Sequence, residues 1–583
     1  MKKLLKYLKR YKLESILGPL FKMLEASFEL LVPLVMARVI DTGIKNQDTG
    51  YIWKMGAVLI LLGVIGLTCS LTAQYFSAKA AVGFGTELRN DLFLHIQKFS
   101  YTEIDQIGTS TLITRMTSDA NQVQNGVNMV LRLFLRSPFI VLGAMIMAFT
   151  IDVKGALVFV VTIPLLSVVV FGILLISMPL YKKVQKQLDQ VLMTTRENLL
   201  GVRVIRAFNR QKDEIRKFDE ENDLLVRFQV FVGKISALMN PVTYIMINGA
   251  IMVLIWTGAW QVEHGAITQG EVVALVNYMS QILVELVKLA NLIITISKSL
   301  ACANRISQVF EQETSISAVL PDEKTEKQQE AGRQDTAFHV EFRQMSFAYG
   351  GAKEESLSHI SLQVKKGQTI GIIGGTGAGK STLVNLIPRF YDVTKGSVLV
   401  DGKDVREYAL EELRQKTGVI PQKAALFKGT IRENMKWGKP DATDEEILQA
   451  LRIAQADDFV LEKEGGLDFL VQQGGKNLSG GQKQRLTIAR ALVRKPEILI
   501  MDDSASALDF ATDAALRKAI RENTKDMTVF LVSQRATTIR QADQIVVLDD
   551  GEMAGCGTHS QLLEGCQVYR EICLSQLSKE EVG

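Results

Sequence analysis

The chain has 583 residues, with 67 Lys and Arg against 63 Asp and Glu, and this near balance gives no reason to expect a nucleic-acid partner. Hydrophobic residues make up 47% and charged residues 22%, a composition between that of a soluble enzyme and that of a purely membrane-embedded protein. The 5 cysteines lack paired short spacings, which argues against a disulfide framework or a zinc knuckle. We therefore expect at least two unlike modules and cysteines in a reducing compartment.

The first half of the chain contains long uncharged runs. Three of them are long enough to cross a bilayer as helices, which takes about 20 apolar residues. A shorter uncharged run and two segments with internal charges bring the predicted spans to six. In chain order they lie at about 16–40, 55–78, 137–151, 155–181, 235–262 and 271–298. Residues 1–12 are basic and no cleavage-site pattern follows them, so the N-terminus is predicted to be cytoplasmic.

Two long polar segments, 80–130 and 182–234, connect the spans on the cytoplasmic side. Both contain few Pro or Gly, so the spanning helices are expected to continue into the cytosol as two helical hairpins. The Lys and Arg of 182–234 agree with the positive-inside rule. Solvated scaffolding is one reading of these hairpins. Their length, far above that of an ordinary connection, favours contact with a cytoplasmic domain.

The composition changes near residue 311. Residues 311–336 are rich in Glu, Lys, Gln and Asp without apolar periodicity and predict a linker. Beyond it, β-rich runs alternate with helical patterns, which is typical of a soluble α/β domain. The predicted domains are a membrane domain at 1–310, the linker at 311–336 and an α/β domain at 337–583.

A glycine-rich loop follows the strand pattern at 368–373 and precedes a helical pattern that starts at Thr382. Its residues are Gly374, Gly375, Thr376, Gly377, Ala378, Gly379, Lys380 and Ser381, which match G-x-x-x-x-G-K-[ST]. The glycines let backbone N–H groups surround a phosphate at a helix N-terminus, Lys380 supplies positive charge, and the Ser381 hydroxyl ligates Mg²⁺. Because a structural turn does not need the Lys-Ser pair, the loop predicts a nucleotide site that extends to Thr382.

Two further motifs follow in the same domain. The apolar strand pattern 498–502 ends in Asp502, which is suited to hold Mg²⁺ opposite the P-loop. Between them lies Leu478-Ser479-Gly480-Gly481-Gln482, and with the P-loop it resembles the ATP-binding-cassette (ABC) ATPases. Over the whole chain the layout resembles ABC exporter half-transporters. The resemblance implies a membrane all-α six-helix domain with long cytoplasmic helical extensions, then an α/β P-loop ATPase domain with a helical subdomain, using ATP and Mg²⁺.

Three other residues match positions with roles in this family. Tyr349 falls where the family stacks an aromatic ring on adenine, with an edge-strand tyrosine as the alternative. Gln422 matches the glutamine that touches Mg²⁺ and senses the membrane half. Asp509, in Ser506-Ala507-Leu508-Asp509, matches the loop that crosses the dimer interface.

The resemblance also implies a partner subunit and a mechanism. Two ATPase domains of this family close head to tail, so that each ATP is held between one chain's P-loop and the other chain's signature. Closure with ATP and release after hydrolysis would shift the membrane half between inward-facing and outward-facing states. Short transverse helices near 114–122 and 202–211 would carry the movement. The signature residues expected to contact the partner's ATP are Ser479, Gly480, Gly481 and Gln482.

Three residues depart from the family pattern. Asp503 stands where hydrolysing sites have a glutamate that orients or deprotonates the attacking water. Gln534 replaces the switch histidine, and glutamine can neither become cationic nor relay a proton. Gln473 replaces a glutamate just before the signature. Asp503 and Gln534 both weaken one pocket, so this site is expected to hydrolyse ATP poorly.

Asp503 and Gln534 depart from the family pattern in one pocket, whereas the signature of the same chain is intact. This combination predicts that the chain is one subunit of a heterodimeric exporter. The partner would be a different half-transporter chain with Glu and His at these two positions. A slow homodimeric exporter of a lipid or a metabolite is one alternative. The other is a nucleotide-gated membrane regulator that transports nothing.

Charged residues within the predicted spans bear on the transported substrate. Lys22, Glu25 and Glu29 share one helical face, and Glu285 and Lys288 lie three residues apart. Their spacing permits either cavity lining or structural ion pairs. A partly acidic cavity would suit amphipathic cations. The expected function is therefore multidrug-type export of amphipathic small molecules across the cell membrane by a multi-pass protein with a cytoplasmic ATPase domain.

Overall fold

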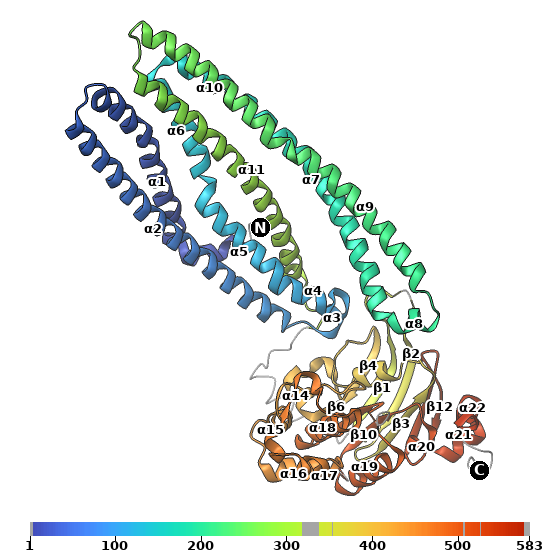
Figure 1. Cartoon of the computed structure of the whole chain (residues 1–583). Coiled ribbons are helices and arrows are strands. Elements are labelled where there is room, and N and C mark those ends of the chain that lie inside the picture. The colour runs from blue at the N-terminus through green and yellow to red at the C-terminus, as the bar shows by residue number, and fades with distance from the viewer. Residues whose placement is uncertain (1–3, 317–336, 353, 505–507, 525, 577–583) are drawn as a thin grey trace. The chain divides into compact units, whose positions relative to one another are not determined.

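The computed structural model describes the chain except for residues 1–3, 317–336, 353, 505–507, 525 and 577–583 (Figure 1). The predicted linker lies mostly outside the described residues. The chain forms two compact units, one made of Met1–Gln97 and Ser110–Gln312, the other of Lys98–Thr109 and Glu313–Gly583. The short segment 98–109, from within the first predicted hairpin, thus belongs to the second unit.

The first unit is entirely helical in its described part. Its elements are η1 (Leu4–Tyr11), α1 (Lys12–Arg38), η2 (Val39–Ile44), α2 (Thr49–Ile96), α4 (Thr109–Thr114), η3 (Arg115–Asp119), α5 (Ala120–Met129), η4 (Val130–Phe134), α6 (Arg136–Ile151), α7 (Val153–Leu200), α8 (Val202–Ala207), α9 (Gln211–Ala237), α10 (Met239–Glu263) and α11 (Gln269–Glu311). Helices α2 and α7 have 48 residues each, far more than a span requires. The predicted continuation of the spans as long helices is therefore found.

Five helical segments of the described chain are long and apolar enough to cross a membrane. They contain α2, α4 to α6, α7, α9 with α10, and α11. Helix α1 is not among them, because Lys22, Glu25 and Glu29 interrupt its apolar sequence. The sixth span at 16–40 stays a prediction.

The first predicted transverse helix is not where we expected it. Residues 114–122 belong to a continuous helical run from α4 through η3 into α5. A separate short helix lies earlier, at α3 (Tyr101–Ile107), where Ser100 and Glu103 form a capping box and Gly108 ends the helix at φ 81°. The second expected helix corresponds to α8.

The second unit is built on two main sheets. The strands β1 (Val340–Phe347), β2 (Leu357–Val364), β4 (Lys395–Val400) and β5 (Lys403–Asp404) form an antiparallel sheet in the order β2-β1-β4-β5. The strands β3 (Thr369–Gly374), β6 (Thr417–Ile420), β9 (Ile498–Asp502), β10 (Thr528–Val532), β11 (Gln544–Asp549) and β12 (Glu552–Gly557) form a six-stranded sheet in the order β12-β11-β3-β10-β9-β6, antiparallel only at β12. A small pair joins β7 (Gly429–Thr430) to β8 (Leu470–Val471).

Helices complete the second unit. Besides α3, they are α13 (Lys380–Asn385), η6 (Val405–Glu407), α14 (Leu410–Lys416), α15 (Ile431–Lys436), α16 (Asp444–Ile453), α17 (Asp457–Glu462), η7 (Gly466–Asp468), η8 (Gln473–Gly475), α18 (Gly480–Val493), α19 (Phe510–Asn523), α20 (Ala536–Ile539), α21 (His559–Gly565) and α22 (Gln567–Gln576). One apolar core, including Phe342, Ile372 and Phe530, joins the two sheets, and another packs α15 to α18 against the parallel sheet. The parallel strand β3 is flanked by β10 and β11, so its carboxyl end opens at the centre of the sheet, where such folds bind ligands.

Candidate nucleotide site

The glycine-rich loop lies between β3 and α13, as predicted. Gly377 and Gly379 both have φ 88°, a backbone conformation that side chains with a Cβ rarely adopt. At Gly374 a Cβ would lie 2.1 Å from the carbonyl oxygen of Leu548 on the neighbouring strand β11. These glycines let the chain turn sharply at the carboxyl end of β3.

Lys380 is held against this loop. Its Nζ donates to the carbonyl oxygens of Gly374 at 3.0 Å and Gly375 at 2.6 Å, and the residue is only 9% exposed. Burial lowers the pKa of Lys380, and the carboxylates of Asp503 and Asp502 partly offset that effect. Because both bonds go to neutral carbonyls, the ammonium charge stays available to a phosphate.

Ser381 and Asp502, the two residues expected to hold Mg²⁺, are in direct contact. The Ser381 hydroxyl donates to Asp502 Oδ1 over 2.8 Å. Burial raises the pKa of Asp502, and the adjacent Asp503 raises it further, against the lowering effect of the Ser381 bond and of Lys380. An exposed hydroxyl bonded to a partly buried carboxylate, next to a second carboxylate, is an oxygen donor set that fits Mg²⁺.

Tyr349 and Thr382 meet at one side of the loop. Their hydroxyl groups share a hydrogen bond of 2.9 Å. Tyr349 is 37% exposed, and its ring packs edge-on against those of Phe347 and Tyr391, with ring centroids 4.9 and 5.4 Å apart. A partly exposed ring tied to the P-loop helix is suitable for stacking on a flat base.

Gln422 and Asp503 lie beside this pocket. Gln422 Nε2 donates to Asp503 Oδ2 at 3.3 Å. The Asp503 N–H donates to the carbonyl oxygen of Val532 on β10, and its backbone has φ 45°. Gln534 is exposed, and its own carbonyl oxygen accepts a bond from Gln576 at 2.7 Å. The structure therefore brings Asp503 to Gln422 but records no bond from the Gln534 side chain within the described residues.

The signature forms the N-terminus of α18. Ser479 and Gln482 make a reciprocal capping box, with Ser479 N to Gln482 Oε1 at 3.0 Å and Gln482 N to Ser479 Oγ at 3.3 Å. Ser479 and Gly480 are exposed, and a Cβ on Gly480 would meet no atom within 4 Å in the described chain. Within the described residues, no neighbouring atom requires a glycine at this position.

The loop expected at the dimer interface is only partly described. Ser506 and Ala507 lie outside the described residues. Asp509 is the N-cap of α19, where its carboxylate accepts bonds from Thr512 N at 2.8 Å and Thr512 Oγ1 at 2.9 Å. Gln473 begins the 3₁₀ turn η8 ahead of the signature.

Side chains of helix α3 contact the residues that follow the P-loop helix, which the sequence analysis does not predict. Within the second unit, the Tyr101 ring lies 4.6 Å from that of Phe390, and Tyr391 Oη donates to Asp105 at 2.7 Å. The S-x-x-E pattern at Ser100 and Glu103 could have located this helix.

A separate cavity of about 540 Å³ lies in the helical unit, lined in part by Glu29, Glu285 and Lys288. Arg136, also missed, donates from its two terminal nitrogens to Glu29 and to Glu285, each at 2.7 Å. Lys288 bonds Glu285 at 2.9 Å, so two basic groups face two acidic groups. The Lys22–Glu25 pair at 2.5 Å completes a set of structural ion pairs.

Comparison with known proteins identifies the family. Residues 15–286 match the family described as ABC transporter transmembrane region, and residues 357–506 match the one described as ABC transporter. The uncharacterized ABC transporter ATP-binding protein YfiB of Bacillus subtilis (strain 168) is 38% identical over 580 residues, covering 100% of this chain and 99% of that protein. The chain belongs to the ABC transporter family.

Other similar proteins of this family have more specific names. The putative multidrug export ATP-binding/permease protein YgaD of Bacillus subtilis (strain 168) is 32% identical, with 98% of each chain covered. An ATP-dependent lipid A-core flippase of Yersinia pestis bv. Antiqua (strain Antiqua) is 29% identical, covering 96% of this chain and 95% of that protein. The structure of a bacterial Atm1-family ABC exporter with ATP bound is 22% identical, with a TM-score of 0.77 over 98% of this chain and 99% of that one.

These findings confirm the predicted fold class, cofactors and location. The chain is a multi-pass membrane ABC transporter with a cytoplasmic ATPase domain that uses ATP with Mg²⁺, and it has the fold of an ABC exporter. ABC exporters act as dimers in the lipid bilayer.

Proposed function

We propose that this chain exports amphipathic small molecules as one subunit of a heterodimer and that its own P-loop forms the weaker of two ATP sites. The observation that carries the proposal is the position of Asp503 beside Gln422, with Gln422 Nε2 3.3 Å from Asp503 Oδ2, in a pocket whose P-loop and Asp502 are intact. Aspartate is one methylene shorter than glutamate, and misplacing a catalytic group by about 1 Å can cost about a hundredfold in rate. Asp503 thus orients the attacking water poorly.

The other residues of the pocket keep their family roles in this proposal. Lys380 and the loop N–H groups bind the phosphates, Tyr349 stacks on adenine, and Ser381, Gln422 and Asp502 hold Mg²⁺. Bound Mg²⁺ offsets negative charge on the phosphates. Gln534 hydrogen-bonds a phosphate oxygen without relaying a proton. The site retains nucleotide and turns it over slowly.

The signature of this chain serves the partner's site. Ser479 and Gly480 are exposed at the N-terminus of the 14-residue helix α18, where N–H groups attract an anion. The open space at Gly480 admits a phosphate carried by another chain. Asp509, at the start of α19, lies at the same dimer interface.

Amphipathic small molecules are the proposed cargo, in line with the name of the multidrug export relative. The charges at the cavity cancel, because Arg136 and Lys288 face Glu29 and Glu285. Because these charges balance, the cavity should not prefer cationic substrates. The sequence alone predicts a partly acidic cavity, which would prefer them. Neutral or zwitterionic amphiphiles suit it equally well, and lipid transport, as in the flippase relative, is the second candidate.

One comparison of mutants tests the asymmetry. Ser479→Ala with Gly480→Asp should abolish most ATPase activity of the complex, because a carboxylate would face the phosphate of the partner's ATP. Asp503→Asn in the same chain should do far less, since the partner's site keeps its own glutamate. Rates are compared at equal complex concentration and saturating Mg²⁺-ATP. Equal, severe losses would support the slow homodimer, and no ATP-dependent transport by an active complex would support the regulator.

A further inference from the structure

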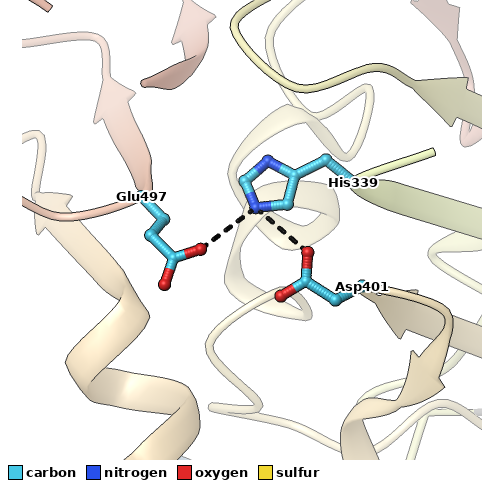
Figure 2. A group of neighbouring side chains, drawn as sticks. All are labelled: His339, Asp401 and Glu497. Carbon is cyan, nitrogen blue, oxygen red and sulfur yellow. Dashed lines mark ion pairs between the residues drawn. The ribbon is translucent and has the colours of Figure 1, made fainter. Parts of the chain in front are cut away.

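Three ionisable side chains, those of His339, Asp401 and Glu497, meet at strand ends of the ATPase domain (Figure 2). His339 directly precedes β1, Asp401 directly follows β4, and Glu497 directly precedes β9. Asp502 of the nucleotide site ends β9, so the whole strand, about 16 Å at 3.3 Å per residue, separates it from Glu497. The cluster is therefore distinct from the ATP site.

The distances within the cluster suit a shared cation. His339 Nε2 lies 3.5 Å from Asp401 Oδ1 and 3.8 Å from Glu497 Oε2, and one ligand atom from each residue lies within 4.8 Å of the others. Ligand atoms about 2.0–2.2 Å from a tetrahedral ion are about 3.3–3.6 Å apart. Small side-chain rotations would bring all three atoms to that spacing.

His339 is buried with its Nε2 directed at the two carboxylates. The residue is 3% exposed, and its Nδ1 shares a 2.7 Å hydrogen bond with Thr528 Oγ1. Nε2 is buried and has no hydrogen-bond partner in the part of the chain that the structure describes. A buried polar nitrogen normally has a hydrogen-bond partner. A histidine whose other ring nitrogen is fixed by a hydrogen bond is typical of metal ligands.

The two carboxylates are oriented by a lysine behind them. Lys416 Nζ donates to Asp401 Oδ2 at 2.6 Å and lies 3.4 Å from Glu497 Oε1, which leaves the other oxygen of each carboxylate facing His339. The Asp401 and Glu497 side chains are 39% and 41% exposed, so an ion can reach them from solvent.

The backbone holds the three residues in register. Asp401 N donates to the carbonyl oxygen of His339 at 2.9 Å, and Thr528 N donates to that of Glu497 at 2.9 Å. Asp401 at φ 49° and Gly402 at φ 76° form the two-residue turn between β4 and β5. The cluster thus sits on strand ends and a tight turn, which favours a preformed site.

We propose that His339, Asp401 and Glu497 bind a divalent transition-metal ion of the Zn²⁺ type, with water completing its coordination. One imidazole with two carboxylates favours such an ion over Mg²⁺ and Ca²⁺, which prefer all-oxygen sites. Binding is reversible, because the Lys416 charge competes for both carboxylates. The ion joins the antiparallel sheet, through His339 and Asp401, to the parallel sheet, through Glu497, and stabilises the domain by mass action.

The test uses the purified full-length protein, freed of metal with a chelator and kept without nucleotide. Co²⁺ titration followed by visible absorption measures binding, and Zn²⁺ titration followed by thermal unfolding measures stabilisation. His339→Gln, Asp401→Asn and Glu497→Gln should each weaken binding on the order of tenfold or more. Asn keeps the positive φ of the turn at position 401. Mg²⁺ and Ca²⁺ should leave the unfolding temperature unchanged.

His359→Asn is the matched control, because His359 is an exposed histidine of the same sheet, at a positive φ that Asn tolerates. It should bind Co²⁺ as the parent does. Undiminished Co²⁺ binding in His339→Gln, or no metal-dependent change in the parent, would overturn the proposal.

A gain-of-binding variant gives a readout that misfolding cannot imitate. Lys416→Gln removes the competing positive charge and should tighten Zn²⁺ binding several-fold. A purely structural ion-pair network predicts no such gain. Unchanged or weaker binding in Lys416→Gln would therefore also count against the site.

Discussion

The Tyr391 hydroxyl donates a 2.7 Å hydrogen bond to the carboxylate of Asp105, a residue of the short helix α3. The Tyr391 ring in turn packs edge-on against Tyr349, whose hydroxyl is bonded to Thr382 at the start of the P-loop helix. Within the second unit, α3 is therefore linked through two tyrosines to the proposed nucleotide pocket. Because α3 follows α2 directly along the chain, a movement of the ATPase domain that shifts α3 can also shift the end of the long helix α2.

Tyr391→Phe should loosen α3 while leaving the ATPase domain folded. It removes one hydrogen bond to a charged acceptor and leaves Asp105 without this donor, a loss of about 1–3 kcal/mol. Faster amide exchange confined to 101–107 is the expected result, together with weaker coupling of ATP hydrolysis to transport. Asp105→Asn, which keeps an acceptor oxygen, should have the smaller effect, and unchanged exchange in both variants would contradict the role of the bond.

Glu103 should make the attachment of α3 sensitive to acid. The residue is 2% exposed; burial raises its pKa, but bonds from Ser100 and Ser315 outweigh that effect and hold the pKa below its usual 4.5. A carboxyl whose folded pKa is lowered contributes stability above its unfolded pKa and loses it as the pH falls through the folded value. Protection of the α3 amides, corrected for intrinsic exchange, should be constant above about pH 5.5 and fall below about pH 4.5.

The control for this pH effect is Glu103→Gln. A neutral amide cannot titrate, so the variant should show weaker and pH-independent protection of α3. An acid transition that persists in Glu103→Gln would assign the effect to another group.

Lys380→Ala should weaken ATP binding at this chain's own pocket. A hydrogen bond to a charged group contributes about 1.5–3 kcal/mol, which corresponds to roughly 10- to 150-fold in affinity. Photolabelling of the isolated chain with an ATP analogue measures the loss. Labelling as strong as in the parent would contradict the P-loop assignment.

The site proposed to be slow should be repairable. Asp503→Glu combined with Gln534→His should raise hydrolysis at the site that carries this chain's P-loop, by more than the sum of the single changes, because both residues act on one water and one phosphate. Single-turnover hydrolysis in the purified complex is the measurement. Gln473→Glu serves as the control for a departure outside the pocket, and no gain in the double variant would place the defect elsewhere.

Arg136→Gln should destabilise the helical unit strongly. It leaves Glu285, which is 3% exposed, without its buried partner, and breaking a buried ion pair in this way costs about 3–5 kcal/mol. Arg132→Gln, one helical turn earlier, is the matched control and should be mild. Adding Glu285→Gln to Arg136→Gln should recover part of the loss in thermal unfolding, and a failure to recover would indicate a different cause.

The sequence predicts the residues of the nucleotide pocket but does not predict helix α3, which is linked to that pocket through two tyrosines. The strand–loop–helix setting of Lys380 and Ser381 was predictable because the phosphate-binding loop imposes residue types at fixed spacing. The sequence does not predict helix α3, because the scarcity of Pro and Gly in 80–130 indicates continuous hairpin helices, although Ser100 and Glu103 carry a capping signal. The sequence does not predict Arg136 as a buried residue, because uncharged runs mark the spans, and a buried arginine is stable there only through partners far away in sequence.

The neighbourhood of Asp503 shows a second limit. Its identity could be compared with a family pattern, but its bond to Gln422 depends on how β6 and β9 lie side by side in the sheet. The cluster of His339, Asp401 and Glu497 could not be predicted for the same reason. Its three members are separated by 62 and 96 residues along the chain and carry no motif. Tertiary pairing alone brings them together.

The open space around Gly480 has a genetic consequence. A Cβ there would meet no atom within 4 Å in the described part of this chain, so the altered subunit should fold, reach the membrane and accumulate normally. In the proposed heterodimer, the altered subunit would still bind the partner subunit and would block ATP hydrolysis at the partner's P-loop. In cells that express both versions of this chain, such an allele would act as a dominant negative, whereas a destabilising allele such as Arg136→Gln would be recessive.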